Sequence, residues 1–308
     1  MNPDVFQSVL ILTGPTGCGK TALGIALAER LGAEIVSMDS MALYRALDIG
    51  TAKPDARDRQ RVQHHLIDVR DPWESASVAW WLQEAARCAA DIERRGKRAL
   101  LVGGTPLYLK AVLRGLFDGP PADVALRRRL SQEAASVGSQ VLHQRLADID
   151  PAAARRLHPN DLRRVIRALE VWELTGRPMS AWQQQWTDDK LPRAASSRCL
   201  CIDLPREELY DRINARVDQM LAAGLVEEVR RLRLLPQPIS QEAAQALGYK
   251  EIFAHLDGQM TLAEAVTLIK TRSRNFAKRQ LTWFRQLPEC RQVTAELTFA
   301  IWGLTMDQ

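Results

Sequence analysis

Eight consecutive residues near the start of the chain have the types and spacing of a loop that binds phosphate. They match the pattern G-x-x-x-x-G-K-[ST] and comprise Gly14, Pro15, Thr16, Gly17, Cys18, Gly19, Lys20 and Thr21. The glycines would let backbone N–H groups converge on phosphate oxygens, and Lys20 would reach the outer phosphate. Thr21 is placed to bind a phosphate-bound Mg²⁺ through its hydroxyl. We predict a phosphate site rather than a glycine-rich connector that binds nothing.

The acid that ATP-hydrolysing proteins need is harder to find. They usually carry an Asp that organises Mg²⁺ at the end of a second apolar strand. The best apolar strand, at 99–102, ends instead in Gly103, Gly104 and Thr105, whereas a weaker strand at 66–69 includes Asp68. The sequence therefore predicts phosphate binding and leaves nucleotide hydrolysis open.

A parallel sheet would bring the chemically active segments together. Short β-type runs at 8–13, 34–37, 66–69, 99–102 and 198–203 alternate with helical stretches, among them a long helix at 77–95. This alternation predicts an α/β fold with a P-loop-type parallel sheet flanked by helices. Ligands of such sheets gather at the carboxyl ends of the strands. The phosphate loop, the pair Asp39 and Ser40, and the turn at 103–105 should meet there.

The middle of the chain has no β-type runs. Gly119, Pro120 and Pro121 mark a break, and helices are expected at 123–136, 139–148 and 161–175. We interpret 119–195 as an all-α insertion domain within a catalytic core formed by 1–118 and 196–308. The core is helical again after 204 and includes a long amphipathic segment at 261–285.

Composition narrows the class of protein. The 308 residues can bury a substantial core, and a net charge of +5 suits a polyanionic partner without requiring one. The five cysteines form no C-x-x-C pair and no His/Cys cluster, which favours a reducing compartment over a zinc site or a disulfide framework. No apolar run approaches the ~18 residues of a membrane helix, and no signal-peptide pattern is seen. We expect a soluble, monomeric protein of the cytoplasm that has no membrane partner.

Two helical stretches carry an excess of basic residues. The segment at 267–285 has six Lys or Arg and no acid, with Phe276, Trp283 and Phe284 interleaved. The insertion adds arginines at 127–129, at 155–156, and at 163, 164 and 167. A solvated helix face would explain either stretch alone, but two of them in a phosphate-binding protein favour nucleic acid. Such contacts would go largely to the nucleic-acid backbone and weaken with salt.

Several further blocks, in order along the chain, resemble those of bacterial tRNA dimethylallyltransferases, also called tRNA isopentenyltransferases. Besides the phosphate loop they are DSMALYR at 39–45, DIGTAKP at 48–54, HHLID at 64–68, GGTPLY at 103–108, HPND at 158–161, RALE at 167–170, LGYK at 247–250 and AKRQLTWFR at 277–285. The chain departs from the family pattern at Gly17 and Cys18, where many members have Ala-Ser, and at Arg163, where Gln is common.

The resemblance implies transfer of a dimethylallyl group from its diphosphate to N6 of the adenine just 3′ of a tRNA anticodon (position 37), with release of pyrophosphate. The adenine amine is a poor nucleophile because its lone pair is delocalised, so a carboxylate that takes its proton would help. Asp39 is the expected general base, and a structural or Mg²⁺-shell Asp is the alternative. Loop amides, Lys20 and Thr16, with Mg²⁺ at Thr21, would stabilise the departing pyrophosphate. Arg216 matches the pyrophosphate-binding arginine of the family, and an arginine on a helix surface is the alternative.

The resemblance also implies which residues contact tRNA, whose target base must leave its stack to reach a buried centre. By family matching these are Asp39, Ser40, Met41, Ala42, Thr105, Arg127, Arg163, Arg164, Val165, Ile166, Arg167, Gln245, Lys250, Lys278 and Arg279. His64 and His65 are interpreted as structural residues with no role in catalysis.

Two other functions share part of this pattern. A P-loop kinase acting on a nucleotide or small molecule would use the same loop, and an Asp at a strand end could deprotonate its acceptor hydroxyl. The basic helical stretches and the missing second-strand acid count against it. An RNA-binding module that holds a regulatory nucleotide in the loop is the non-catalytic alternative, and the place of Asp39 argues weakly against it.

Overall fold

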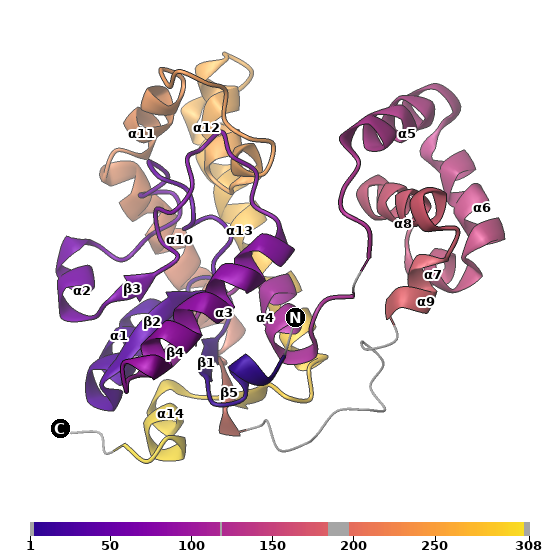
Figure 1. Cartoon of the computed structure of the whole chain (residues 1–308). Coiled ribbons are helices and arrows are strands. Elements are labelled where there is room, and N and C mark those ends of the chain that lie inside the picture. Colours follow the sequence, from indigo (N-terminus) through magenta and orange to yellow (C-terminus); the bar gives the residue numbers. More distant parts are fainter. Residues whose placement is uncertain (1–2, 118, 184–196, 305–308) are drawn as a thin grey trace. The chain divides into compact units, whose positions relative to one another are not determined.

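A computed structural model of the protein describes residues 3–117, 119–183 and 197–304. The chain divides into two compact units, one formed by residues 1–113 and 192–308 and the other by residues 114–191 (Figure 1). The first unit is α/β and the second consists of helices, so the predicted fold class is confirmed. The predicted end of the insertion, at residue 195, lies outside the described residues.

The described part of the first unit is built on a six-stranded parallel sheet. Its strands are β1 (Leu10–Thr13), β2 (Ala33–Ser37), β3 (His64–His65), β4 (Arg98–Val102), β5 (Cys199–Ile202) and β6 (Arg291–Val293). Their order is β3-β2-β4-β1-β5-β6. Leu12 of β1 lies opposite Val102 of β4 and Leu200 of β5, so β1 is an inner strand with neighbours on both sides.

Two strands differ from the sequence prediction. The strand predicted at 66–69 is wrong, because β3 forms two residues earlier and the chain then turns. Leu66 and Asp68 have φ angles of 59° and 57°, a left-handed conformation that interrupts a strand. The edge strand β6 is not predicted, since Arg-Gln-Val is short and has one apolar residue in three.

Helices surround the sheet of the first unit (Figure 1). They are α1 (Lys20–Leu31), α2 (Ala56–Arg61), α3 (Val78–Arg94), α4 (Pro106–Arg114), α10 (Arg206–Ala222), α11 (Leu225–Leu232), α12 (Tyr249–Leu256), α13 (Leu262–Arg285) and α14 (Ala295–Ile301). Ser77 caps α3 by accepting a bond from Trp80 N. Buried Trp81 stacks on Tyr108 of α4 and donates to the carbonyl of Ser37, which fixes α3 beside the end of β2.

The second unit has its own apolar core. Its helices are α5 (Val124–Val137), α6 (Ser139–Ile149), α7 (Pro151–Arg156), α8 (Leu162–Thr175) and α9 (Met179–Trp182). Leu130, Leu142, Leu146, Val165 and Leu169 are fully buried between them. Among the described residues of either unit, no helix is long and apolar enough to cross a membrane.

Candidate active site

The phosphate loop lies between β1 and α1, in the strand–loop–helix context that its pattern requires. Gly14, Gly17 and Gly19 have φ angles of 154°, 84° and 86°, in the region that favours glycine. At Gly17 a Cβ would also lie 2.8 Å from Cγ1 of Ile213, so a side chain there would need both strain and repacking. The loop ends at the N-terminus of α1, whose first N–H groups have no partner within the helix. These N–H groups can therefore donate hydrogen bonds to an anion.

Lys20 and Thr21 open α1 beside this loop. Lys20 folds back over it, with Nζ donating to the carbonyl of Pro15 at 3.3 Å. Thr21 is half-buried in the first turn. A hydroxyl together with diphosphate oxygens is a donor set that suits Mg²⁺, which prefers oxygen ligands and retains several waters. Within the described residues no group of three or more His, Cys, Asp or Glu could hold a metal alone, so Mg²⁺ here would depend on the diphosphate for ligands.

The turn at 103–105 joins the end of β2 to the phosphate loop. A Cβ on Gly103 would lie 2.2 Å from the carbonyl oxygen of Met38. One on Gly104 would lie 2.9 Å from the carbonyl oxygen of Gly14 and 3.3 Å from Cε of Lys20. Both glycines are needed because the backbones approach too closely for a side chain. Three strand ends therefore meet at one edge of the sheet, as the sequence predicts.

Asp39 is half-buried at this edge. Its Oδ1 accepts hydrogen bonds from the backbone N–H groups of Met41 at 2.8 Å and Ala42 at 3.4 Å. The N–H of Ser40 donates to Oγ1 of Thr105 at 3.1 Å. These bonds fix the carboxylate and bring five of the predicted tRNA-binding residues together, although the side chain of Ala42 is buried.

Arg216 lies on α10. Burial lowers the pKa of its guanidinium, while the negative charge of Asp39 raises it. The sequence prediction misses Arg212, one helical turn earlier. Its Nη1 lies 3.5 Å from the position that a Cβ on Gly19 would take. Arg212 is exposed and pairs with Glu208 at 2.7 Å, so α10 places one further cation beside the phosphate loop.

Glu228, on α11, holds the segment that Arg216 contacts. Arg216 Nη2 donates to the carbonyl of Thr51 at 3.4 Å. The carboxylate of Glu228 accepts from the hydroxyl of Tyr249 at 2.6 Å, and from three backbone N–H groups just before Thr51, those of Asp48, Ile49 and Gly50. Glu228 is only 4% exposed. A carboxylate on an otherwise apolar helix face is the sequence signal that could have revealed it.

Gln280, on α13, is a second buried polar residue that the sequence prediction misses. It contacts the phosphate loop and the turn at 103–105 at once, through hydrogen bonds to Thr16 and Gly104. By contrast, the neighbouring Lys278 and Arg279 are exposed, as are the predicted tRNA contacts Gln245 and Lys250.

Asp68, His64 and His65 make structural contacts. Burial raises the pKa of Asp68, but hydrogen bonds from Lys53 and Arg59 outweigh it and hold the pKa below its usual value. Nε2 of His65 lies 2.7 Å from Oε2 of buried Glu34, and Nδ1 of His64 lies 2.7 Å from the carbonyl oxygen of Val62. The weaker candidate for the Mg²⁺-organising acid is therefore engaged by two cations.

In the helical unit, Arg127 and Arg167 converge on the fully buried carboxylate of Glu170. Arg127 binds it through Nε and Nη2, both at 2.9 Å, and Arg167 through Nη1 at 2.6 Å. Nη2 of Arg167 donates to the carbonyl of Pro120, and Asp123 N donates to Glu170. Burial raises the pKa of Glu170, but these cations outweigh it and keep the carboxylate ionised. Arg167 is thus held inside the unit, whereas the Arg127 side chain is 43% exposed.

The segment at 163–167 divides by helix face. Arg163 and Arg164 are exposed, whereas the side chains of Val165 and Ile166 pack in the core of the unit. Any contact with tRNA that involves side chains of this segment therefore belongs to the arginines. Arg164 also pairs with Asp161 at 3.3 Å, which leaves Arg163 as the less engaged of the two.

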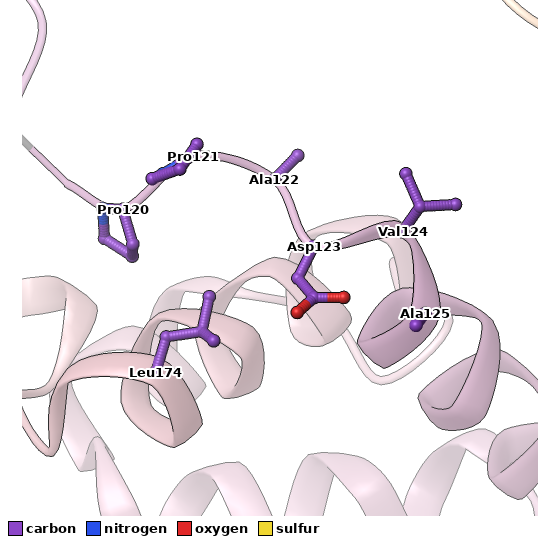
Figure 2. Close-up of a pocket in the computed structure, with 7 residues that line it drawn as sticks. All are labelled: Pro120, Pro121, Ala122, Asp123, Val124, Ala125 and Leu174. Carbon is purple, nitrogen blue, oxygen red and sulfur yellow. The ribbon is translucent and has the colours of Figure 1, made fainter.

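An open hollow on the helical unit lies beside the Glu170 cluster (Figure 2). It is lined by Pro120, Pro121, Ala122, Asp123, Val124, Ala125 and Leu174. Asp123, its one ionisable residue, caps α5 by accepting from Leu126 N at 2.9 Å. This lining carries no cation and no glycine-rich loop that could hold a diphosphate, so the strand ends of the first unit are the better candidate site.

Comparison with known proteins agrees with the sequence pattern. The IPP transferase family model matches residues 42–287, and an isopentenyl transferase model matches residues 7–74. A tRNA dimethylallyltransferase of Geobacter metallireducens is 50% identical over 290 residues, 93% of this chain and 92% of the relative. One from Geobacillus kaustophilus is 46% identical over 284 residues, 92% of this chain and 89% of the relative.

Solved structures give the same likeness. The full-length tRNA isopentenylpyrophosphate transferase of Bacillus halodurans is 42% identical with a TM-score of 0.68, over 96% of this chain and 94% of the other. A eukaryotic dimethylallyltransferase acting on tRNA is 28% identical with a TM-score of 0.74, over 97% of this chain and 81% of the other.

Proposed function

The chain belongs to the tRNA dimethylallyltransferase (IPP transferase) family, and we propose that it transfers the dimethylallyl group of dimethylallyl diphosphate to N6 of adenine 37, next to the tRNA anticodon. Pyrophosphate is the second product. The observation that carries this proposal is that Asp39 and the phosphate loop share one edge of the sheet, where the turn at 103–105 contacts both. An acid and an anion site are thereby available to the two halves of one displacement. We propose the cytoplasm, where tRNA is found, as the place of action.

Asp39 would act as the general base. As the amine attacks the allylic carbon, the new C–N bond forms, the C–O bond to the diphosphate breaks and the amine must lose a proton. Met41 and Ala42 donate to Oδ1 of Asp39, which orients the carboxylate and suits Oδ2 to take that proton.

Fixed donors would stabilise the leaving group. Negative charge grows on the bridging oxygen as the C–O bond breaks, and donors already in place act there without reorganisation. Lys20, Arg216, the hydroxyl of Thr16 and the loop N–H groups are the residues of this chain that would supply them. Mg²⁺, held by Thr21 and the diphosphate, would neutralise further charge when bound.

The exposed basic residues would bind the RNA backbone. Arg163 in the helical unit and Lys278 and Arg279 on α13 are exposed and suited to phosphate contacts, which set register without reading sequence. Arg127 would contact tRNA from a position fixed by Glu170. Ser40, Met41 and Thr105 would surround the extruded adenine beside Asp39.

Radiolabelled donor tests this function. Dimethylallyl diphosphate labelled in the prenyl group, with Mg²⁺ and unmodified tRNA, should place label in the tRNA without ATP, and digestion should yield N6-prenylated adenosine. Pyrophosphate should appear in equal amount. Turnover of ATP with no label in tRNA would support a kinase instead. If the protein catalyses neither reaction, the RNA-binding module is the remaining alternative.

A further inference from the structure

Gln280 is a glutamine almost fully removed from solvent, at 3% exposure, yet both ends of its amide are used. Oε1 accepts from the backbone N–H of Thr16 at 2.9 Å, and Nε2 donates to the carbonyl of Gly104 at 2.5 Å. It lies on the buried face of α13 with Ala277 and Phe284. The amide therefore spans the gap between the phosphate loop and the turn that follows β4.

Thr16 and Gly104 lie 88 residues apart in the chain. Because the Gln280 amide pairs with the N–H of Thr16 and the carbonyl of Gly104, these two backbone groups do not need to bond to each other. The N–H of Thr16 is taken up by Gln280, so it is not available to a phosphate oxygen in this arrangement. Thr16 would then reach the diphosphate through its hydroxyl, and the N–H groups that follow it in the loop would supply the remaining donors.

We propose that Gln280 is a positioning residue for the phosphate loop, a role that rests on the proposed function. By fixing Thr16 against Gly104 it sets the separation between the loop and the turn, and so the width of the diphosphate site near Lys20. A misplacement of about 1 Å in such a site lowers the rate on the order of 10²-fold. Gln280 need not touch the substrate to matter.

The chemistry of this position requires an amide. Glutamine has one acceptor and one donor group, which match the N–H of Thr16 and the carbonyl of Gly104. A glutamate would keep the bond to Thr16 but set a carboxylate oxygen against the carbonyl of Gly104. A methionine would fill the same space and leave both backbone groups unsatisfied in a buried place.

The test compares Gln280→Met and Gln280→Glu with Gln286→Met, which makes the first change at an exposed position of the same chain. Calorimetry measures the binding of Mg²⁺-pyrophosphate, and steady-state kinetics give KM and kcat for dimethylallyl diphosphate. Filter binding measures the affinity for tRNA. Thermal unfolding shows which variants are folded. We expect both Gln280 variants to lose about 10–100-fold in pyrophosphate affinity and in kcat/KM for the donor. Their affinity for tRNA should stay within about twofold of wild type. For Gln286→Met, all of these constants should stay within about twofold of wild type.

Pyrophosphate affinity and donor kcat/KM unchanged in either folded Gln280 variant would overturn the proposal, as would an equal loss in Gln286→Met. An equal loss of tRNA affinity would also overturn it, since that indicates general damage. If Gln280→Met does not fold, Gln280→Glu, which keeps size and one bond, gives the decision. Failure of the proposed function is a separate result: the wild-type protein would then label no tRNA, whatever the Gln280 variants do to pyrophosphate binding.

Discussion

At the scale of single residues, Asp39 could be either the general base or a structural residue that only holds its turn. Its hydrogen bonds from Met41 and Ala42 would by themselves account for the structural role. An asparagine at this position could keep the acceptor of those bonds, since its amide oxygen takes the place of Oδ1. It could not take a proton, so the substitution removes the basic group and preserves the turn.

We therefore expect Asp39→Asn to lower kcat by about 10²–10⁴-fold, the usual contribution of a general base, with KM for the prenyl donor changed little. Steady-state kinetics with saturating tRNA measure both constants, and the melting temperature checks the fold. Asp39→Ala, which also removes the turn bonds, is the comparison. If Asp39→Asn keeps wild-type kcat, Asp39 is structural and not the base.

Cys18 illustrates a departure from the family pattern that the structure accounts for. The residue is 4% exposed, and burial raises the pKa of its thiol despite the opposing charge of Lys20. A raised pKa means that less thiolate exists at any given pH, so nucleophilic and oxidative reactivity fall. Within the loop, Cys18 acts as a small apolar group that packs into the core of the unit.

Single polar residues limit what a sequence can reveal. The phosphate loop, Asp39 and the turn at 103–105 were predictable, because their chemistry is local and strand ends meet by rule. Gln280, Glu228 and Glu170 were not predicted, since a polar residue in an amphipathic helix is usually solvated. Each falls on the helix face formed by buried apolar neighbours, and only the tertiary partner decides that it is buried there.

At the scale of elements, α11 and α12 fix a loop that neither helix contains. Glu228 and Tyr249 form a buried pair, and the carboxylate completes its bonds with N–H groups of residues 48–50. Burial, and then the nearby charge of Glu228, raise the pKa of Tyr249, so its hydroxyl stays protonated and can donate. Thr51, whose carbonyl receives Arg216, follows directly.

Removing this hydroxyl should loosen the loop. We expect Tyr249→Phe to lower the free energy of unfolding by about 1.5–3 kcal/mol, the usual worth of a hydrogen bond to a charged group. Urea denaturation followed by circular dichroism measures the change. Tyr210→Phe, at a half-buried position on α10, should change it by less than about 0.5 kcal/mol. Equal stabilities of Tyr249→Phe and wild type would show that the bond contributes nothing net.

Element order was only partly predictable. Alternating strands and helices indicate a parallel sheet, but they do not state which strands are neighbours. That order follows from how crossover helices cover the sheet, and β3 shows how a local turn outweighs apolar residues: Leu66 and Asp68 leave the extended region directly after two paired residues. The end of the helical insertion near 195 remains a prediction.

At the scale of the whole molecule, both units carry exposed basic residues, and the proposed function requires one RNA to contact both. Arg163 lies in the helical unit and Lys278 in the α/β unit, each exposed. Because the residues lie in separate units, their contributions to the binding free energy should add.

We expect Arg163→Ala and Lys278→Ala each to weaken tRNA binding and to reduce the slope of log K against log salt by about 0.7–0.9, the value for one phosphate contact. The double variant should lose the sum of the two single losses, and donor binding should not change. Filter binding from low to moderate salt provides the slopes. A variant that keeps the full wild-type slope would remove its unit from the RNA interface.

The position of β1 in the sheet also has a consequence for synthesis on the ribosome. β1 pairs with β4 on one side and β5 on the other, and the helical unit separates these two partners in the chain. Roughly a hundred residues must be translated after β4 before β5 appears, which takes about 5–20 s. During that interval the nascent protein has an open sheet edge on the strand that leads into its phosphate loop. The pairing of β1 with β5 closes that edge only after the insertion has left the ribosome, and β6 is added later on the other side of β5.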